Sequence, residues 1–218
     1  MTHLHIPDGV LPLVLWAPGL AVALLLLALS ALALRGANRQ RVAYQGALGA
    51  LVLAVMAVEV PLGPLEYHLT LMGPVGVLLG PAGAFQVAFV ASAILALVGH
   101  GGLTVVGLNA MVLGAGSALA RPAYALLAGR LGPAPAMACA TAVTQLVSGA
   151  LWLAVVAAGM HAGGTGAHRL RLFAAFAFPL WLVGIVVEAL VAWGIAGFIA
   201  RVRPDLLPGG KAATEGAS

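Results

Sequence analysis

The segment from Val10 to Leu34 contains no Asp, Glu, Lys or Arg. An α-helix of about 20 residues, rising about 1.5 Å per residue, crosses the roughly 30 Å hydrocarbon core of a bilayer. This segment is therefore long enough to span a membrane. Charged residues make up only 7% of the 218 residues, whereas about 25% are charged in a typical soluble domain. The composition excludes a compact water-soluble fold.

Similar apolar segments recur along the chain and predict an all-α polytopic membrane protein. We expect a single transmembrane domain over residues 1–208, followed by a polar, disordered tail at 209–218. The stretch 160–171 is rich in Gly and His and is expected to be a loop. The expected spans are approximately residues 12–34, 42–60, 69–79, 82–98, 103–127, 134–159 and 173–199.

Arginine marks the ends of these segments that face the cytoplasm. Lys and Arg are enriched in cytoplasmic loops, which places Arg35–Arg41, Arg121–Arg130 and Arg201–Arg203 inside. The uncharged N-terminus then faces outward and the C-terminus inward, so the number of crossings must be odd. Arg169 and Arg171 fall on the outer side, against the rule.

A short third crossing resolves the count at seven. The segment 69–79 is expected to enter the membrane as a short helix and to turn at Gly80-Pro81, because proline breaks a continuous helix. A broken helix is tolerated at membrane depth when other helices bury its ends. Gly76 and Gly80 are four residues apart, a spacing that allows close helix packing.

Several function classes are excluded by what the sequence lacks. The single Cys139 rules out a disulfide framework and a cysteine zinc site. No basic stripe with interleaved aromatic residues is present, so nucleic acid is not an expected partner. The N-terminus lacks the positive region and the short apolar core of a cleaved signal peptide. The absence of an H-E-x-x-H motif argues against a membrane-embedded metalloprotease.

The N-terminus itself has the chemistry of a metal chelate. With His3 in third place, one short peptide supplies the Met1 amine, two backbone amides and an imidazole. An all-nitrogen square-planar set is typical of Ni(II) and Cu(II) sites. The turn at Pro7-Asp8-Gly9 leads directly into the first span, and Asp8 is expected to hydrogen-bond its own backbone. Alternatively, a histidine near a flexible terminus has no function.

Other polar residues stand near the expected outer ends of the spans. His68 is either a further ligand reaching the chelate or an interfacial histidine beside Tyr67. All six histidines fall on the outer side in this topology: His3, His5, His68, His100, His161 and His168. Asp8, Thr70, His100 and Asn109 are candidate pocket residues, of which His100 and Asn109 are expected to be hydrogen-bonding groups rather than ligands.

Three polar residues are expected inside spans: Glu188, Glu59 and Gln45. An ionisable residue within a span indicates a functional role by default. The alternative is a structural one, in which Glu188 pairs with a Trp, Gln or Arg of another helix.

Four sequence blocks resemble the substrate-binding membrane component of energy-coupling-factor nickel/cobalt transporters, the CbiM/NikM type. They occur in the family order and extend over about residues 4–207. The blocks are His5-Ile-Pro-Asp-Gly9, then Gly76-Val-Leu-Leu-Gly-Pro81, then Gly99-His-Gly-Gly-Leu-Thr104 with Gly107-Leu-Asn109, then Val187-Glu-Ala-Leu190 with Arg201-Val-Arg-Pro204.

The resemblance implies a seven-helix subunit that captures Ni(II) or Co(II) as transported substrate and is not an enzyme. It implies nitrogen ligands from the N-terminal amine, from the amide and imidazole of a second-position histidine, and from a loop histidine that His68 matches. It also implies a transmembrane coupling subunit, two ATP-binding subunits and an optional small accessory membrane subunit as partners, besides membrane lipid. The chain lacks a G-x-x-x-x-G-K-[ST] loop, so no ATP site is expected in it.

The start of the chain departs from the family pattern, which begins Met-His-Ile-Pro-Asp-Gly. Here three residues precede Leu4, so His5 stands in fifth place. Either the mature chain begins at position 4 and His5 is the ligand, which we favour, or Met1 is removed and His3 becomes the second residue. Vitamin-binding components of the same transporter class, and a passive channel, remain rival hypotheses. The sequence does not choose between nickel and cobalt.

Overall fold

Six α-helices and one short β-hairpin make up the computed structural model, which describes residues 6, 8–58, 60–62, 65–162 and 167–210. The helices agree with the predicted all-α class, and two three-residue strands add to it. In chain order the elements are α1 (Leu13–Ala33), α2 (Arg39–Met56), β1 (Val60–Leu62), β2 (Leu65–Tyr67), α3 (Met72–Leu97), α4 (Val106–Leu131), α5 (Pro133–Ala162), α6 (Ala167–Val202) and the 3₁₀ turn η1 (Pro204–Leu206).

Five helices are long and apolar enough to cross a membrane: α1, α3, α4, α5 and residues 178–202 of α6. The helix α2 is not among them because it begins with a charged, polar turn, Arg39-Gln-Arg41. The prediction of a loop at 160–171 is wrong at both ends. Residues up to Ala162 continue α5, and α6 already begins at Ala167.

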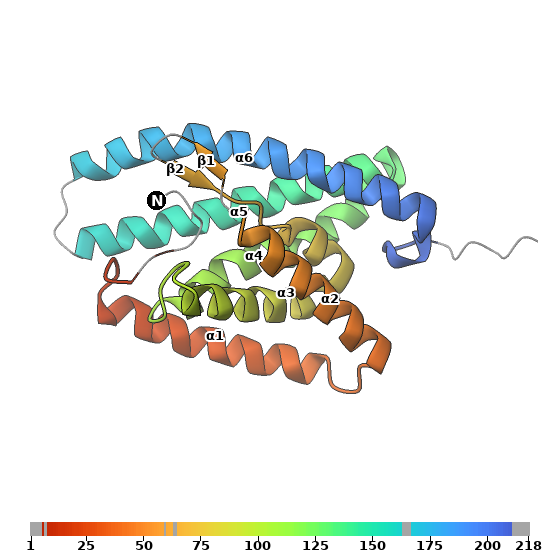
Figure 1. The fold of residues 1–218 in the computed structure, drawn as a ribbon, viewed down its shortest axis with the longest axis horizontal. Coiled ribbons are helices and arrows are strands. Elements are labelled where there is room, and N and C mark those ends of the chain that lie inside the picture. The colour runs from red at the N-terminus through yellow and green to blue at the C-terminus, as the bar shows by residue number, and fades with distance from the viewer. Residues whose placement is uncertain (1–5, 7, 59, 63–64, 163–166, 211–218) are drawn as a thin grey trace, which may run out of the picture.

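The helix α3 is broken where the sequence predicted a break. Gly80 has φ 74° and ψ 178°, so the helix consists of a short piece before it and a longer piece after Pro81. Only glycine adopts such a conformation without steric cost. The chain turns back at this point (Figure 1), so the short piece and the long piece run in different directions.

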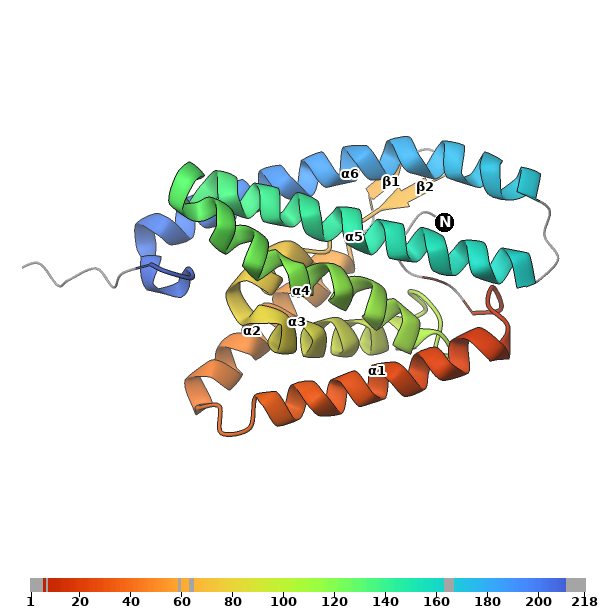
Figure 2. The same cartoon turned by 180° about the vertical axis from the view of Figure 1, so that it is seen from behind.

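Close packing at small residues joins α3 to α4 and α4 to α1. A Cβ atom on Gly76 would lie 2.8 Å from the Cβ of Ala120 on α4, and one on Gly107 would lie 2.6 Å from the Cα of Leu20 on α1. The predicted role of Gly76 in helix packing is confirmed, while Gly80 serves the kink. In the apolar 18-residue stretch of each helix, 56% of α3 is buried inside the bundle but only 17% of α1. Figure 2 shows α4 between α3 and α5.

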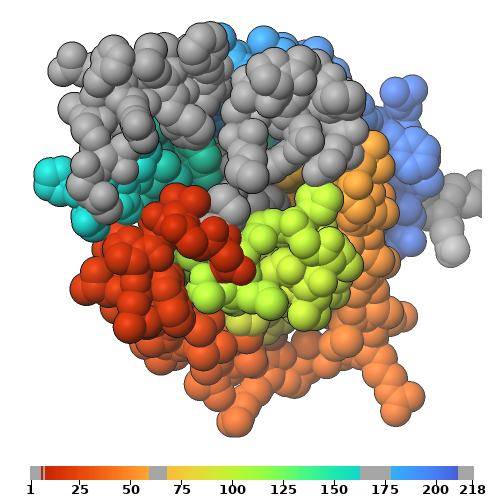
Figure 3. Space-filling model, turned by 60° about the vertical axis from the view of Figure 1, so that its left-hand side comes forward, coloured from red at the N-terminus to blue at the C-terminus, as the bar shows by residue number. Residues whose placement is uncertain are grey.

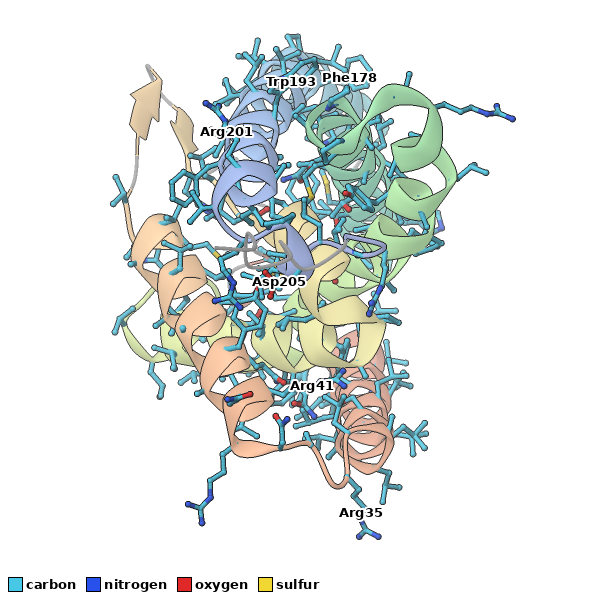
Figure 4. The ribbon with its side chains drawn as sticks, turned by 90° about the vertical axis from the view of Figure 1, so that its right-hand side faces the viewer. Arg35, Arg41, Phe178, Trp193, Arg201 and Asp205 are labelled. Carbon is cyan, nitrogen blue, oxygen red and sulfur yellow. The ribbon has the colours of Figure 1, made fainter. Side chains whose placement is uncertain are left out.

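The two ends of the bundle differ in charge. The α1–α2 connection, the α4–α5 turn and the end of α6 lie at one end, and the N-terminal segment and the α3–α4 connection lie at the other (Figure 1). Figure 4 looks onto the first of these ends, where it labels Arg35, Arg41 and Arg201. Arg203 forms a two-fold hydrogen-bonded pair with Asp205 there, at 2.8 and 2.9 Å.

Candidate metal-binding site

Ile6 and Asp8 are held against the bundle at the end opposite Arg35, Arg41 and Arg201 (Figures 1 and 4). The Ile6 side chain is fully buried and packs in a cluster with Leu11, Val105, Leu108 and Val156. Burying an isoleucine contributes about 1.5–3 kcal/mol relative to leaving it exposed. This segment is therefore anchored, contrary to the expectation for a loose terminus.

Asn109 on α4 fixes the backbone of this segment. Its Oδ1 accepts from the Ile6 amide at 2.7 Å, and its Nδ2 donates to the Ile6 carbonyl at 3.1 Å. Because Asn109 is only 2% exposed, water has little access here, and the Asn109 side chain itself satisfies both Ile6 backbone groups. The prediction that Asn109 is a hydrogen-bonding group near a span end is confirmed, and its partner is the segment next to the candidate ligands.

Asp8 forms a second anchor, against the α3–α4 connection. Its Oδ2 accepts from the Leu103 amide at 2.9 Å, and its Oδ1 accepts from the Thr104 amide at 2.9 Å and the Thr104 hydroxyl at 2.5 Å. The hydroxyl bond is the main reason why the pKa of Asp8 is lowered, since it favours the charged carboxylate. The expectation that Asp8 bonds its own backbone is replaced by this long-range contact. Figure 3 shows the red N-terminal residues lying against the yellow-green connection.

Gly102 makes the close approach of Asp8 possible. A Cβ atom at this position would lie 2.5 Å from the Asp8 amide nitrogen and 2.7 Å from its Cγ. A side chain of any size would therefore push the carboxylate away from its donors. The glycine at position 102 in the block that includes His100 is thus explained by packing, and His100 itself is half-buried.

His68 lies in the segment that connects the hairpin to α3, and it is 5% exposed. The following residues are held by buried polar groups of two other helices. The Glu188 carboxylate on α6 accepts from the Thr70 amide at 2.5 Å and the Leu71 amide at 3.2 Å. Gln145 on α5 donates from Nε2 to the Thr70 hydroxyl at 2.9 Å. The expected alternative, in which Glu188 pairs with a Gln of another helix, agrees with the structure: its carboxyl group interacts with the side chains of Gln145 on α5 and Thr70, besides the two backbone amides.

The remaining predicted residues divide into two groups. Gln45 on α2 donates to the Gln86 side chain on α3 at 2.6 Å, so it links these two helices. Met1, His3, His5 and Glu59 lie outside the described residues. Within the part of the chain that the structure describes, no three His, Cys, Asp or Glu side chains are grouped to hold a metal ion.

Nearly the whole chain, residues 5–206, matches the family described as the cobalt uptake substrate-specific transmembrane region, CbiM. The chain belongs to the CbiM family. The family is one of metal uptake transporters, which are not enzymes. The five apolar helices make this CbiM protein a multi-pass membrane protein, as the sequence predicted. The resemblance seen in the four sequence blocks is confirmed.

Two solved structures share the fold of this CbiM protein. One is a truncated transition metal transporter, with a TM-score of 0.74, 20% identity, and coverage of 90% of this chain and 96% of the other. The second is a transition metal transporter, with a TM-score of 0.79, 20% identity, and coverage of 91% and 93%. At this identity the likeness shows the fold alone. No curated protein sequence matches the chain.

The sequence did not reveal three features that fix the segments next to the candidate ligands: the Gln145 side chain, the backbone conformation of Leu71 and the backbone groups of Ile6. Gln145 stands in an apolar run of α5, and a buried amide inside a span was the signal that could have found it. Leu71 gives no such signal, because nothing in its side chain indicates its left-handed backbone, with φ 55°. The role of the Ile6 backbone was equally invisible, because every residue carries the same amide and carbonyl groups.

Proposed function

We propose that this CbiM protein captures Ni(II) or Co(II) at the outer side of the cytoplasmic membrane. In this proposal it is the substrate-specific subunit of an energy-coupling-factor transporter. A transmembrane coupling subunit, two ATP-binding subunits and, where present, a small accessory membrane subunit complete the complex. Hydrolysis of ATP by the partners drives reorientation of the subunit and inward release of the metal.

The observation that carries this proposal is the pairing of Asn109 with both backbone groups of Ile6. Two hydrogen bonds to one buried residue fix the position and the direction of the chain there. The residue that precedes Ile6 in the sequence is His5, the favoured ligand, so the described anchor lies one position away from it. A free tail would not give a metal chelate a defined place.

The ligand set we propose consists of nitrogens. The N-terminal amine, a backbone amide and the imidazole of His5 or His3 form fused chelate rings, and His68 supplies a further imidazole. Imidazole and amide nitrogens suit Ni(II) and Cu(II), with Co(II) lower in the affinity order. If the mature chain begins at position 4, His5 is the ligand; if it begins at Thr2, His3 takes that role. The intact mass of the protein from its native host distinguishes these starts.

The proposed topology has seven crossings, with the N-terminus outside and the C-terminus in the cytoplasm. Three features support it. The break at Gly80 divides α3 into a short and a long crossing. The arginine-bearing connections lie at one end of the bundle (Figure 4), as the positive-inside rule requires for a cytoplasmic face. His68 and the anchored N-terminal segment lie toward the outer side in this arrangement.

Metal binding by the purified protein tests the proposal. Isothermal titration with Ni(II) and Co(II) in detergent is expected to show one high-affinity site in the wild type, and His68→Ala is expected to lose it. Binding should also weaken at acidic pH, because the ligands must be deprotonated. The matched control is His161→Ala, which removes an exposed histidine at the end of α5 and should bind like the wild type. An unchanged affinity in His68→Ala would refute the ligand assignment.

A further inference from the structure

The segment from His68 to Met72, which we call the strap, leads from the hairpin into the first residue of α3. Four of its five residues, His68, Thr70, Leu71 and Met72, are each at most 5% exposed. Its backbone is held by α5 and α6, which are far away in sequence. The Glu188 carboxylate accepts the amides of Thr70 and Leu71, while Gln145 binds the Thr70 hydroxyl.

The strap holds a backbone conformation that its own sequence disfavours. Leu71 has φ 55° and ψ 13°, and it is the one non-glycine residue with positive φ among the described residues. The left-handed region is sterically unfavourable for leucine, whose side chain makes no local hydrogen bond that would offset the cost. Such a conformation persists only where the surrounding structure fixes it, and it is typical of functional sites. The bond from the Leu71 amide to Glu188 acts directly on the strained residue.

Glu188 lies where backbone donors converge. Leu71 is the N-cap of α3, and the Glu188 carboxyl group accepts from its amide, one of those that the start of the helix leaves open, and from the amide of the preceding residue, Thr70. At 1% exposure, an uncompensated carboxylate would be costly. The structure compensates the buried carboxyl group with two backbone donors, the amides of Thr70 and Leu71, and with the side chains of Thr70 and Gln145. A glutamate that served only to fill space between helices would not need to accept the Thr70 and Leu71 amides.

We infer that Glu188 is a positioning residue for His68, acting through the strap, and that Gln145 assists it through Thr70. This inference rests on the proposed function of His68 as a metal ligand. The strap fixes where the His68 backbone leaves the bundle, so it fixes the direction of the imidazole. Because Glu188 belongs to α6, a displacement of α6 relative to α3 would move the strap and misalign the ligand. Metal affinity is thereby coupled to the position of the last transmembrane helix.

The substitution Glu188→Gln tests the inference with little change in shape. The Gln carbonyl can still accept one amide, but its NH₂ group then faces the other amide, which is also a donor. We expect a 10- to 100-fold loss of Ni(II) affinity, the usual range for a group that orients a ligand. We also expect a shifted Ni(II) d–d absorption band in the protein that still binds, because His68 no longer lies in the ligand plane. The control is Leu190→Ala, which changes a lipid-facing side chain that is 65% exposed on the same helix.

The spectrum separates positioning from a merely structural role. If Glu188 only stabilises the fold, Glu188→Gln lowers the fraction of competent protein but leaves the band of the bound metal unchanged, and this result overturns the inference. Wild-type affinity in Glu188→Gln, with binding lost in His68→Ala, overturns it as well while leaving the proposed function intact. Absence of high-affinity binding in the wild type, or full binding by His68→Ala, removes the proposed function and the inference with it.

A second variant serves if Glu188→Gln does not fold. Thr70→Val keeps the side-chain shape but removes the hydroxyl that Gln145 binds and that accepts from the Met72 amide at 3.3 Å. We expect a smaller loss of affinity, about 3- to 10-fold, since a neutral hydrogen bond is weaker than one to a charged group. The same shift of the d–d band is expected, and an unchanged band in folded Thr70→Val overturns the inference.

Discussion

Replacement of Asn109 by alanine should release the N-terminal segment from the bundle. Asn109 satisfies the amide and the carbonyl of Ile6 at 2.7 and 3.1 Å, in a position that is 2% exposed. Asn109→Ala leaves both backbone groups buried without these bonds. Each such group costs about 1–3 kcal/mol, so we take about 3 kcal/mol for the pair. This energy favours the open segment, in which water satisfies both groups.

The expected size of the effect follows from that energy. A loss of about 3 kcal/mol in the free energy of local opening raises the open population about 100-fold, since 1.4 kcal/mol is a factor of ten. The Ile6 side chain and the Asp8 contacts still hold the closed state, so the bundle itself should remain folded. Local opening of this kind is measured by amide hydrogen exchange.

The assay is hydrogen exchange with mass spectrometry on the N-terminal peptide of the detergent-solubilised protein. Deuterium uptake by the peptide that contains Ile6 should be about 100-fold faster in Asn109→Ala than in the wild type. The control is Ser117→Ala on the same helix, because the buried Ser117 hydroxyl bonds only the Gly114 carbonyl one turn away, at 2.9 Å. Equal uptake in Asn109→Ala and the wild type, with α4 still protected, would refute the role of Asn109 as the anchor.

Two further predictions concern the Asp8 anchor, and the same exchange assay checks both. Gly102→Ala places a Cβ 2.5 Å from the Asp8 amide nitrogen and should destabilise the closed N-terminal segment by about 1–3 kcal/mol, the usual cost of overpacking. The control is Gly46→Ala, whose added Cβ meets nothing within 4 Å and which should exchange like the wild type. Amide protection retained in Gly102→Ala would contradict the contact between Gly102 and Asp8. The pKa of Asp8 is lowered from 3.8 by the Thr104 hydroxyl, so its stabilising effect is present above pH 3.8 and is lost as the pH falls through the lowered pKa. Asp8→Asn should lose protection at neutral pH and show no such acid step, whereas an identical pH profile in both proteins would exclude this carboxylate.

A common arrangement links the two anchored segments. In each, buried backbone groups outside regular structure find partners on helix side chains: the Ile6 amide and carbonyl on Asn109, and the Thr70 and Leu71 amides on Glu188. Irregular backbone at membrane depth requires this, because lipid offers no hydrogen bonds. Asn109 serves the N-terminal segment, and Glu188 serves the strap that begins at His68. The most restrained backbone outside the helices is thus next to the proposed ligands.

Much of the fold could be predicted from the sequence because it depends on local properties. The apolar segment that becomes α1 was placed within one residue at each end, since helix length and hydropathy alone decide that it spans. The break at Gly80-Pro81 was also predictable, because proline removes a helix hydrogen bond and glycine alone tolerates the turn. The hairpin β1–β2 was not, because its three-residue strands have no periodic pattern to detect.

The candidate site was less predictable from the sequence than the fold, because the contacts of its residues are long-range. The sequence identified His68, Asp8, Asn109 and Glu188 as polar residues in places where polarity is costly, and by resemblance it assigned them to a metal transporter. It could not identify their partners. Glu188 meets Thr70 across 118 positions, Asn109 meets Ile6 across 103, and Asp8 meets Leu103 across 95.

The sequence by itself determined that this chain lies in a membrane, where α3 breaks, and which family it belongs to. These properties follow from the solvation of each segment and the conformational limits of single residues, and neighbours along the chain suffice to set them. Only the tertiary structure decided that Ile6 is clamped by α4 and that the His68 strap is held by α5 and α6. Those contacts depend on which helix faces meet, and this is fixed by the packing of all the helices together, through close approaches such as that of Gly76 to α4.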